Sequence, residues 1–222
     1  MNYFSHGHQC LDDPYFLAGV SVPDWLSVVD RKVRARSAQA RPFQQSVDSQ
    51  EASVAGGIIQ HHLEDDWFHR TRAFSELSWQ FTISIRDILP PDDGFRPSFL
   101  GHILVELLLD DALIQRNPSK LDEYYRMVEG LDVGRVAELV NRMTNKPSDR
   151  LAEFIGLFSK ERFLYDYAEN AKLLVRLNQV MRRVRLPSLP ESVVDFFPDA
   201  REAVQARWTE LLDPNDAVKE KE

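Results

Sequence analysis

The sequence predicts an all-α protein, and three observations support this prediction. Only nine glycines occur in the 222 residues. No segment alternates apolar and polar residues over the length that a half-buried strand requires. Apolar residues instead recur every three to four positions, which is the spacing of one face of a helix. A chain of this length buries a sufficient core without disulfides, so we expect one helical domain over residues 1–222.

The first half of the chain contains four expected helices, at about residues 23–36, 54–74, 75–89 and 98–116. Pro23 suits the first turn of a helix, where its missing N–H costs nothing. Ser75 and Ser98 are the expected N-caps of the third and fourth helices. The sequence PPDDG at 90–94 separates these two helices, because proline blocks helix propagation and Asp-Gly favours a turn.

The second half contains four further expected helices, at about residues 119–129, 133–144, 149–185 and 199–212. The long third one is expected to break near residues 166–170. The sequence LPSLPES reads as a linker before the last helix. Residues 213–222 are polar and end in a charged run, so we expect a disordered tail there.

Charge and composition exclude several classes of protein. The net charge of −8 opposes general nucleic-acid binding, which normally requires a basic surface. A single cysteine, Cys10, cannot form an intramolecular disulfide or a thiolate metal cluster. No apolar run approaches the roughly 20 residues of a membrane helix, and the N-terminus does not resemble a secretion signal. We therefore expect a cytoplasmic protein that does not contact a membrane.

The stretch GGIIQHHLEDDWFH concentrates three of the six histidines and an acidic triplet on one expected helix. His61, Asp65 and His69 are spaced four residues apart, so their side chains share one face. His62 and Asp66 form a parallel row beside them. Nitrogen and oxygen donors without thiolate suit Zn, Mn, Fe or Mg. A solvated helix face would have the same spacing, and the pattern leaves both interpretations open.

The expected helix at 98–116 favours the metal interpretation. In FLGHILVELLLDDAL the apolar residues cover every face, which is typical of a buried helix. His102 and Glu106, again four residues apart, are therefore expected to point into the protein. A buried, unpaired charge costs several kcal/mol, so a metal ion or a network from a neighbouring helix must compensate it.

Four motifs in order resemble the acyl carrier protein phosphodiesterase family. They are NYFSH, LAGVSVPDW, GIIQHHLEDDWFH and LGHILVELLLDDALI, and they lie within about the first 115 residues. Members of that family are all-helical, are related to HD-type metal-dependent phosphohydrolases, and remove the phosphopantetheine arm from acyl carrier protein. The resemblance implies an HD-type helical fold and phosphoric diester hydrolysis.

By position, the resemblance implies one site in which a divalent metal is bound by His6, Asp24, His61, Asp65, His102 and Glu106. The expected catalytic carboxylates within this set are those of Asp24, Asp65 and Glu106. His6 and Asp24 would complete the ligand shell or serve as the base. His61 is favoured over His62 as the ligand by its register to Asp65 and by the family pattern.

Four positions depart from the family pattern. Val20 replaces an asparagine and Leu107 replaces a histidine, which removes two polar side chains. His69 and His102 stand where aspartates are expected, and both still offer a ligand atom. His69 and Arg70 are secondary candidates, His69 for supporting the site and Arg70 for contacting a substrate phosphate.

The implied chemistry is attack on a phosphodiester by water activated at a bound Mn, Fe, Zn or Mg ion. The expected partner is acyl carrier protein or a small phosphodiester. Two basic stretches, at 31–41 and 172–185, each hold five Lys or Arg and no acid. They are candidate docking surfaces for an acidic carrier or a nucleotide, although a solvated helix face would read the same.

Three alternatives stay open at this point. A carboxylate-bridged di-iron protein would require paired Glu-x-x-His motifs, and only Asp66-x-x-His69 approximates one. A different metallohydrolase could act on a nucleotide, a phospholipid or a small ester. A degenerate, non-catalytic relative could bind a partner helix, which the changes at Val20 and Leu107 would favour.

Overall fold

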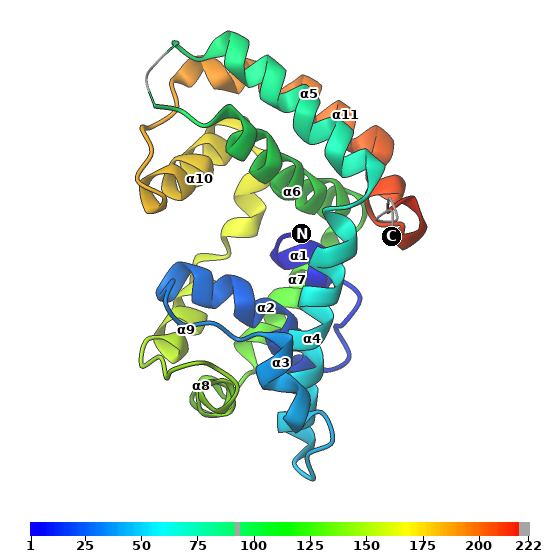
Figure 1. Ribbon diagram of the computed structural model, residues 1–222, viewed down its shortest axis with the longest axis vertical. Helices are drawn as coiled ribbons and strands as arrows, with labels where there is room; N and C mark the ends of the chain where they lie inside the picture. The colour runs from blue at the N-terminus through cyan, green and yellow to red at the C-terminus, as the bar shows by residue number, and fades with distance from the viewer. Residues whose placement is uncertain (92–93, 218–222) are drawn as a thin grey trace. The chain divides into compact units, whose positions relative to one another are not determined.

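The computed structural model describes residues 1–91 and 94–217, and within these ranges it contains helices and no strand (Figure 1). The predicted all-α class is confirmed. The α-helices are Tyr3–Gly7 (α1), Pro14–Val29 (α2), Ser37–Ala40 (α3), Ser49–Phe68 (α4), Arg72–Ile88 (α5), Pro97–Arg116 (α6), Pro118–Glu129 (α7), Val133–Arg142 (α8), Leu151–Glu161 (α9), Asn170–Arg183 (α10) and Phe197–Leu211 (α11). The 3₁₀ turns are Arg41–Phe43 (η1), Phe163–Ala168 (η2), Glu191–Phe196 (η3) and Pro214–Asp216 (η4).

The chain divides into two compact units. The α2 unit comprises Asn2–Asp65 and Asn117–Arg162. The α6 unit comprises Met1, Asp66–Arg116 and the chain from Phe163 onward. The boundary falls inside α4, directly after Asp65, so the two halves of the histidine-rich stretch belong to different units.

Helix α2 differs from the helix expected at 23–36. It begins at Pro14, because the Asp13 side chain accepts hydrogen bonds from the backbone N–H groups of Tyr15 and Phe16 and so caps it. Pro23 lies inside the helix rather than at its start. The helix ends at Val29, and Val33, within the range expected to be helical, is buried outside any helix.

The junction expected between residues 74 and 75 also lies elsewhere. Helix α4 ends at Phe68 and α5 begins at Arg72. Thr71, not Ser75, is the N-cap, since its hydroxyl accepts a hydrogen bond from the N–H of Phe74. The break leaves His69 just beyond the end of α4.

Within the α2 unit, α2 and α4 cross at two glycines. A Cβ atom added to Gly57 would lie 2.3 Å from the carbonyl oxygen of Phe16 and 2.7 Å from the nitrogen of Val20. A Cβ atom added to Gly19 would lie 2.4 Å from the carbonyl oxygen of Val54. Side chains of any size at these positions would force the two backbones apart, so both glycines are required for this crossing.

Within the α6 unit, α5, α6 and α11 pack against one another (Figure 1). Residues 104–114 of α6 are buried, as the sequence predicts. The expectation that His102 points into the protein is wrong, because its side chain, nearer the start of the helix, is 41% exposed. The carboxylate of Asp111 on this helix is buried and is paired with Arg201 of α11, whose guanidinium also donates to the carbonyl oxygen of Tyr167. Burial raises the pKa of Asp111 although Arg201 acts against it.

Part of the tail expected to be disordered has a defined structure. Pro214–Asp216 form η4, and the carboxylate of Asp216 accepts a hydrogen bond of 3.1 Å from the N–H of Ala73. Residues 218–222 of that tail, and residues 92–93 of the PPDDG turn, lie outside the described residues.

None of the helices described here combines the length and the hydrophobicity needed to cross a lipid bilayer.

The Gly57→Ala substitution should destabilise the protein by about 1–3 kcal/mol, because the new methyl group meets backbone atoms that cannot turn away. Gly156→Ala is the matched control. It lies within α9, where no atom is within 4 Å of the added Cβ, and it should stabilise the protein by about 0.5–1 kcal/mol. Urea unfolding measures both free energies, and equal midpoints for the two variants would contradict the close crossing.

Candidate metal centres

The residues that the sequence nominates as ligands gather into two clusters of three. The His6 cluster consists of His6, His61 and Asp65, and the Glu106 cluster consists of His69, His102 and Glu106. In each cluster the candidate ligand atoms lie within 4.8 Å of one another. All members of the His6 cluster belong to the α2 unit, and all members of the Glu106 cluster belong to the α6 unit. Asp24 belongs to neither cluster and lies half-buried on α2.

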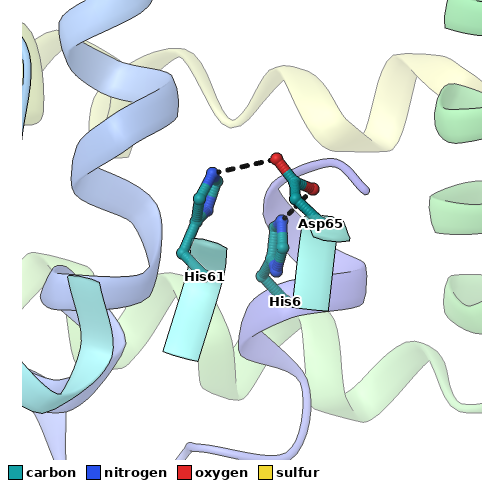
Figure 2. Close-up of side chains that lie close together, drawn as sticks. All are labelled: His6, His61 and Asp65. Carbon is teal, nitrogen blue, oxygen red and sulfur yellow. Dashed lines mark ion pairs between the residues drawn. The ribbon is translucent and has the colours of Figure 1, made fainter. Parts of the chain in front are cut away.

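The His6 cluster joins α1 to α4. His61 and Asp65 lie one turn apart on α4, and His6 comes from the short helix α1 (Figure 2). Helix α1 is held at its start by Ser5, whose hydroxyl donates to the carbonyl oxygen of Asn2 and accepts from the N–H of Asn2. The imidazole rings of His6 and His61 stack with centroids 4.1 Å apart and planes inclined by 29°. Both rings therefore present the same edge to the carboxylate of Asp65.

The inner nitrogen of each ring is held by a hydrogen-bond acceptor. Nδ1 of His6 donates to the carboxylate of Glu64 at 2.6 Å, and Nδ1 of His61 donates to the carbonyl oxygen of Val20 at 2.8 Å. A carboxylate or carbonyl oxygen here only accepts, so Nδ1 carries the proton in both rings. The Nε2 atoms are thereby directed at Asp65, which is the arrangement that protein metal sites use to orient histidine ligands.

The distances around Asp65 fit a metal ion. Nε2 of His6 lies 3.3 Å from Oδ1, and Nε2 of His61 lies 3.4 Å from Oδ2. A tetrahedral ion with ligands at its usual bond lengths separates neighbouring ligand atoms by about 3.3 Å. Nε2 of His6 is also buried without a hydrogen-bond partner in the described part of the chain. A bound cation would satisfy that buried nitrogen, so the residues present fit the group that the sequence implies.

The electrostatics of the His6 cluster favour an ionised carboxylate. Burial opposes the charge of the His6 imidazolium, but contacts with Asp65 and Glu64 outweigh it and raise the pKa of His6 above its usual value. Burial likewise opposes ionisation of Asp65, and His6 and His61 overcome it, so the pKa of Asp65 falls well below its usual range. Asp65 is therefore ionised, and a carboxylate beside two imidazole nitrogens is a donor set that a divalent cation can use.

The two neighbouring histidines are engaged elsewhere. Nε2 of His62 donates to the carbonyl oxygen of Ala35 at 2.7 Å, so this nitrogen is engaged outside the His6 cluster. Burial lowers the pKa of His62. Nδ1 of His8 donates to the carbonyl oxygen of Ser5, and burial lowers the pKa of His8 as well. Of the adjacent pair in the sequence, the structure places His61 in the cluster.

The Glu106 cluster converges on one oxygen atom. Nε2 of His69 lies 2.8 Å from Oε1 of Glu106, and Nε2 of His102 lies 3.2 Å from the same atom. The α-amino group of Met1 lies 3.7 Å from it. The ring of Phe74 packs edge-on against both imidazoles, with centroids 4.9 Å from His69 and 4.8 Å from His102. These contacts fix both rings beside the carboxylate.

Glu106 is ionised despite its burial. Burial opposes the charge, but the ammonium of Met1 and the rings of His102 and His69 outweigh it and hold the pKa of Glu106 well below its usual range. The sequence predicted that a buried charge at Glu106 would need compensation, and the Met1 ammonium and the two imidazoles supply it. His69, nominated only as a supporting residue, contacts Glu106 as closely as any other group does.

Three further positions that the sequence singled out contribute no side chain to either cluster. Arg70 is folded back along the chain, where its guanidinium pairs with the Asp66 carboxylate and donates to the Asp66 carbonyl oxygen. Leu107 is buried in the core of the α6 unit. Val20 serves the His6 cluster through its carbonyl oxygen, which any residue at that position would supply.

Sequence patterns did not reveal Glu64 as the partner of His6. The two residues are 58 positions apart, so no local periodicity connects them. Glu64 also accepts a hydrogen bond from Gln60 one turn earlier on α4. Only the packing of α1 against α4 shows what the carboxylate does.

In the metal-free protein, Glu64→Gln should destabilise the fold more at about pH 6 than at about pH 8.5. The pKa of His6 is raised in the folded chain. Pairing of its imidazolium therefore adds stability that is complete below the unfolded pKa of 6.5 and is lost as pH rises through the folded pKa. Urea unfolding in the presence of a chelator measures this difference.

The matched control for this experiment is Gln60→Ala, which removes a contact to Glu64 but keeps its charge. Its effect on the free energy of unfolding should be the same at both pH values. An equal loss at both pH values for Glu64→Gln would show that Glu64 does not stabilise the His6 imidazolium.

Comparison of the chain with models of protein families, with curated proteins and with solved structures found no match.

Proposed function

We propose that this chain is a metal-dependent phosphodiester hydrolase whose catalytic ion binds at the His6 cluster. One observation carries the proposal: two stacked imidazoles have Nδ1 held by Glu64 and by the Val20 carbonyl, and direct Nε2 at one carboxylate. Metal-ligating histidines almost always have their second ring nitrogen held in this way.

The residues of the cluster have distinct tasks in this proposal. Nε2 of His6, Nε2 of His61 and the Asp65 carboxylate would hold the ion. The side chain of Asp65 is 30% exposed, whereas the two histidines are buried. Water and substrate would therefore reach the ion from the side of Asp65. A bound divalent ion would supply a water of lowered pKa and would neutralise phosphoryl charge. Two nitrogens and a carboxylate suit Zn, Mn or Fe more than Mg.

An exposed basic segment supports an anionic substrate. Residues 31–41 carry their five Lys and Arg side chains on the surface. In the described part of the chain, none of the four arginines in this segment forms an ion pair with a carboxylate. The carbonyl of Ala35 in the same segment accepts the hydrogen bond from His62, the neighbour of His61 on α4. The basic segment is thereby linked to α4 at the residue next to His61, although the protein carries a net charge of −8.

The second basic stretch, at 172–185, is partly neutralised within the protein. Lys172 pairs with Glu169 at 2.8 Å, and Arg176 pairs with Asp166. The segment at 31–41 is therefore the better surface for an acidic partner. With the resemblance of the first 115 or so residues to acyl carrier protein phosphodiesterases, it favours a phosphodiester on an acidic carrier protein in the cytoplasm over a nucleotide or a small ester.

The His61→Ala variant should lose the metal ion of the His6 cluster, and its rate of bis(p-nitrophenyl) phosphate hydrolysis should fall by about 100-fold or more. Loss of a residue that only orients a metal ligand already lowers activity by up to about 100-fold, and His61 is itself a proposed ligand. Elemental analysis and phosphodiesterase assays after reconstitution with Zn, Mn or Fe measure both effects. His62→Ala is the matched control, because it removes an adjacent histidine whose Nε2 is bound to the Ala35 carbonyl.

Retention of metal and activity in His62→Ala, with loss of activity and of the ion of the His6 cluster in His61→Ala, would support the proposal. Metal bound normally by a folded His61→Ala variant would refute the assignment of the ion. Metal bound to the wild-type protein without phosphodiesterase activity on the model substrate or on a phosphopantetheine-bearing carrier would refute the reaction and leave a metal-binding protein.

A further inference from the structure

The Glu106 cluster is not used by the proposed reaction, although it has the same composition as the His6 cluster. Each contains a histidine and a carboxylate one turn apart on one helix, together with a histidine from outside that turn. In the Glu106 cluster the helical pair is His102 and Glu106 on α6, and the third member is His69, beyond the end of α4.

The three side chains form more contacts than a simple ion pair on a helix surface would, because two histidines contact one carboxylate oxygen. Two Nε2 atoms, from residues 33 positions apart, approach the same oxygen of Glu106 at 2.8 and 3.2 Å. Their rings lie 4.8 Å apart with planes inclined by 31°. The Phe74 ring, itself buried, contacts both imidazoles edge-on and holds them in this orientation.

The cluster is also accessible to an ion. The side chains of His69 and His102 are 32% and 41% exposed, whereas that of Glu106 is 12% exposed. The carboxylate thus forms the buried side of the cluster, and the imidazoles form its solvent-exposed side. Ligands of this kind leave a coordination position free towards solvent, as in His₂Glu zinc sites.

We propose that His69, His102 and Glu106 form a second divalent-cation site, independent of the His6 cluster. Two imidazoles and one carboxylate select Zn²⁺, Co²⁺ or Ni²⁺ over Mg²⁺ and Ca²⁺, which prefer sets of oxygen ligands. The ion would lie between the two Nε2 atoms and Oε1 of Glu106 and would supply positive charge beside this carboxylate. Each cluster draws all of its ligands from one unit, so neither requires the other to be filled.

Titration of the metal-free protein with Co²⁺ alone tests the second site, because tetrahedral Co²⁺ with nitrogen ligands absorbs visible light and calorimetry counts the ions. The wild type should bind two ions per chain, one for each cluster. His102→Ala and His61→Ala should each bind one ion, and the double variant should bind none. His8→Ala, which removes a histidine outside both clusters, should still bind two.

The outcomes separate this proposal from the proposed function. One ion, lost in His61→Ala and kept in His102→Ala, would refute the second site and leave the catalytic assignment intact. One ion lost only in His102→Ala would do the reverse. One ion lost in both single variants would show a single shared site and refute independence. Glu106→Gln, which keeps the shape of the side chain, should also bind one ion and guards against a folding defect in His102→Ala.

Discussion

The crossing of α2 and α4 at Gly19 and Gly57 is the constraint on which the His6 cluster depends. Backbone atoms meet there without intervening side chains. Val20 follows Gly19 directly, and His61 lies one turn beyond Gly57 on α4. The crossing therefore brings the carbonyl of Val20 within 2.8 Å of Nδ1 of His61. A wider crossing would break this hydrogen bond, and the His61 ring would lose the contact that orients it. The close approach of α2 and α4 at Gly19 and Gly57 therefore determines which nitrogen of His61 carries the proton.

In both clusters, imidazoles stabilise the charge of a carboxylate that is shielded from water. A carboxylate that is partly or wholly removed from water would ordinarily become neutral. Asp65 and Glu106 instead stay ionised because two imidazoles surround each of them, with the Met1 ammonium as a further cation near Glu106. The clusters differ in support and access. The His6 cluster has a buried pair of rings with anchored Nδ1 atoms, whereas the Glu106 cluster has more exposed rings positioned by an aromatic contact.

That difference decides which cluster we assign to catalysis. A reaction that depends on a water of lowered pKa benefits from ligands that do not move, and anchored imidazoles supply this rigidity. The exposed basic segment at 31–41 is tied to the same helix through His62 and Ala35. The α2 unit thus supplies both the oriented ligands and the basic segment for an anionic substrate. The Glu106 cluster, in the α6 unit, is not needed for this reaction and could bind a separate cation.

The sequence by itself determined the all-α class and the two helical ligand pairs. Periodicity of apolar residues and the four-residue spacing of His61 with Asp65 and of His102 with Glu106 are local properties, which survive in any arrangement of the helices. Local signals were less reliable at helix ends. Pro23 reads as a helix start, but the cap at Asp13 and the burial of the segment after it carry the helix through that proline.

Only the tertiary structure decided how the nominated residues group together. The sequence and its family resemblance predicted one site of six ligands, whereas the structure forms two clusters, leaves Asp24 outside both and brings His69 into one of them. Glu64 and the Val20 carbonyl became visible only as partners of rings 58 and 41 positions away. Such contacts depend on helix packing, which is set by the whole core, and no periodicity within a single helix encodes them.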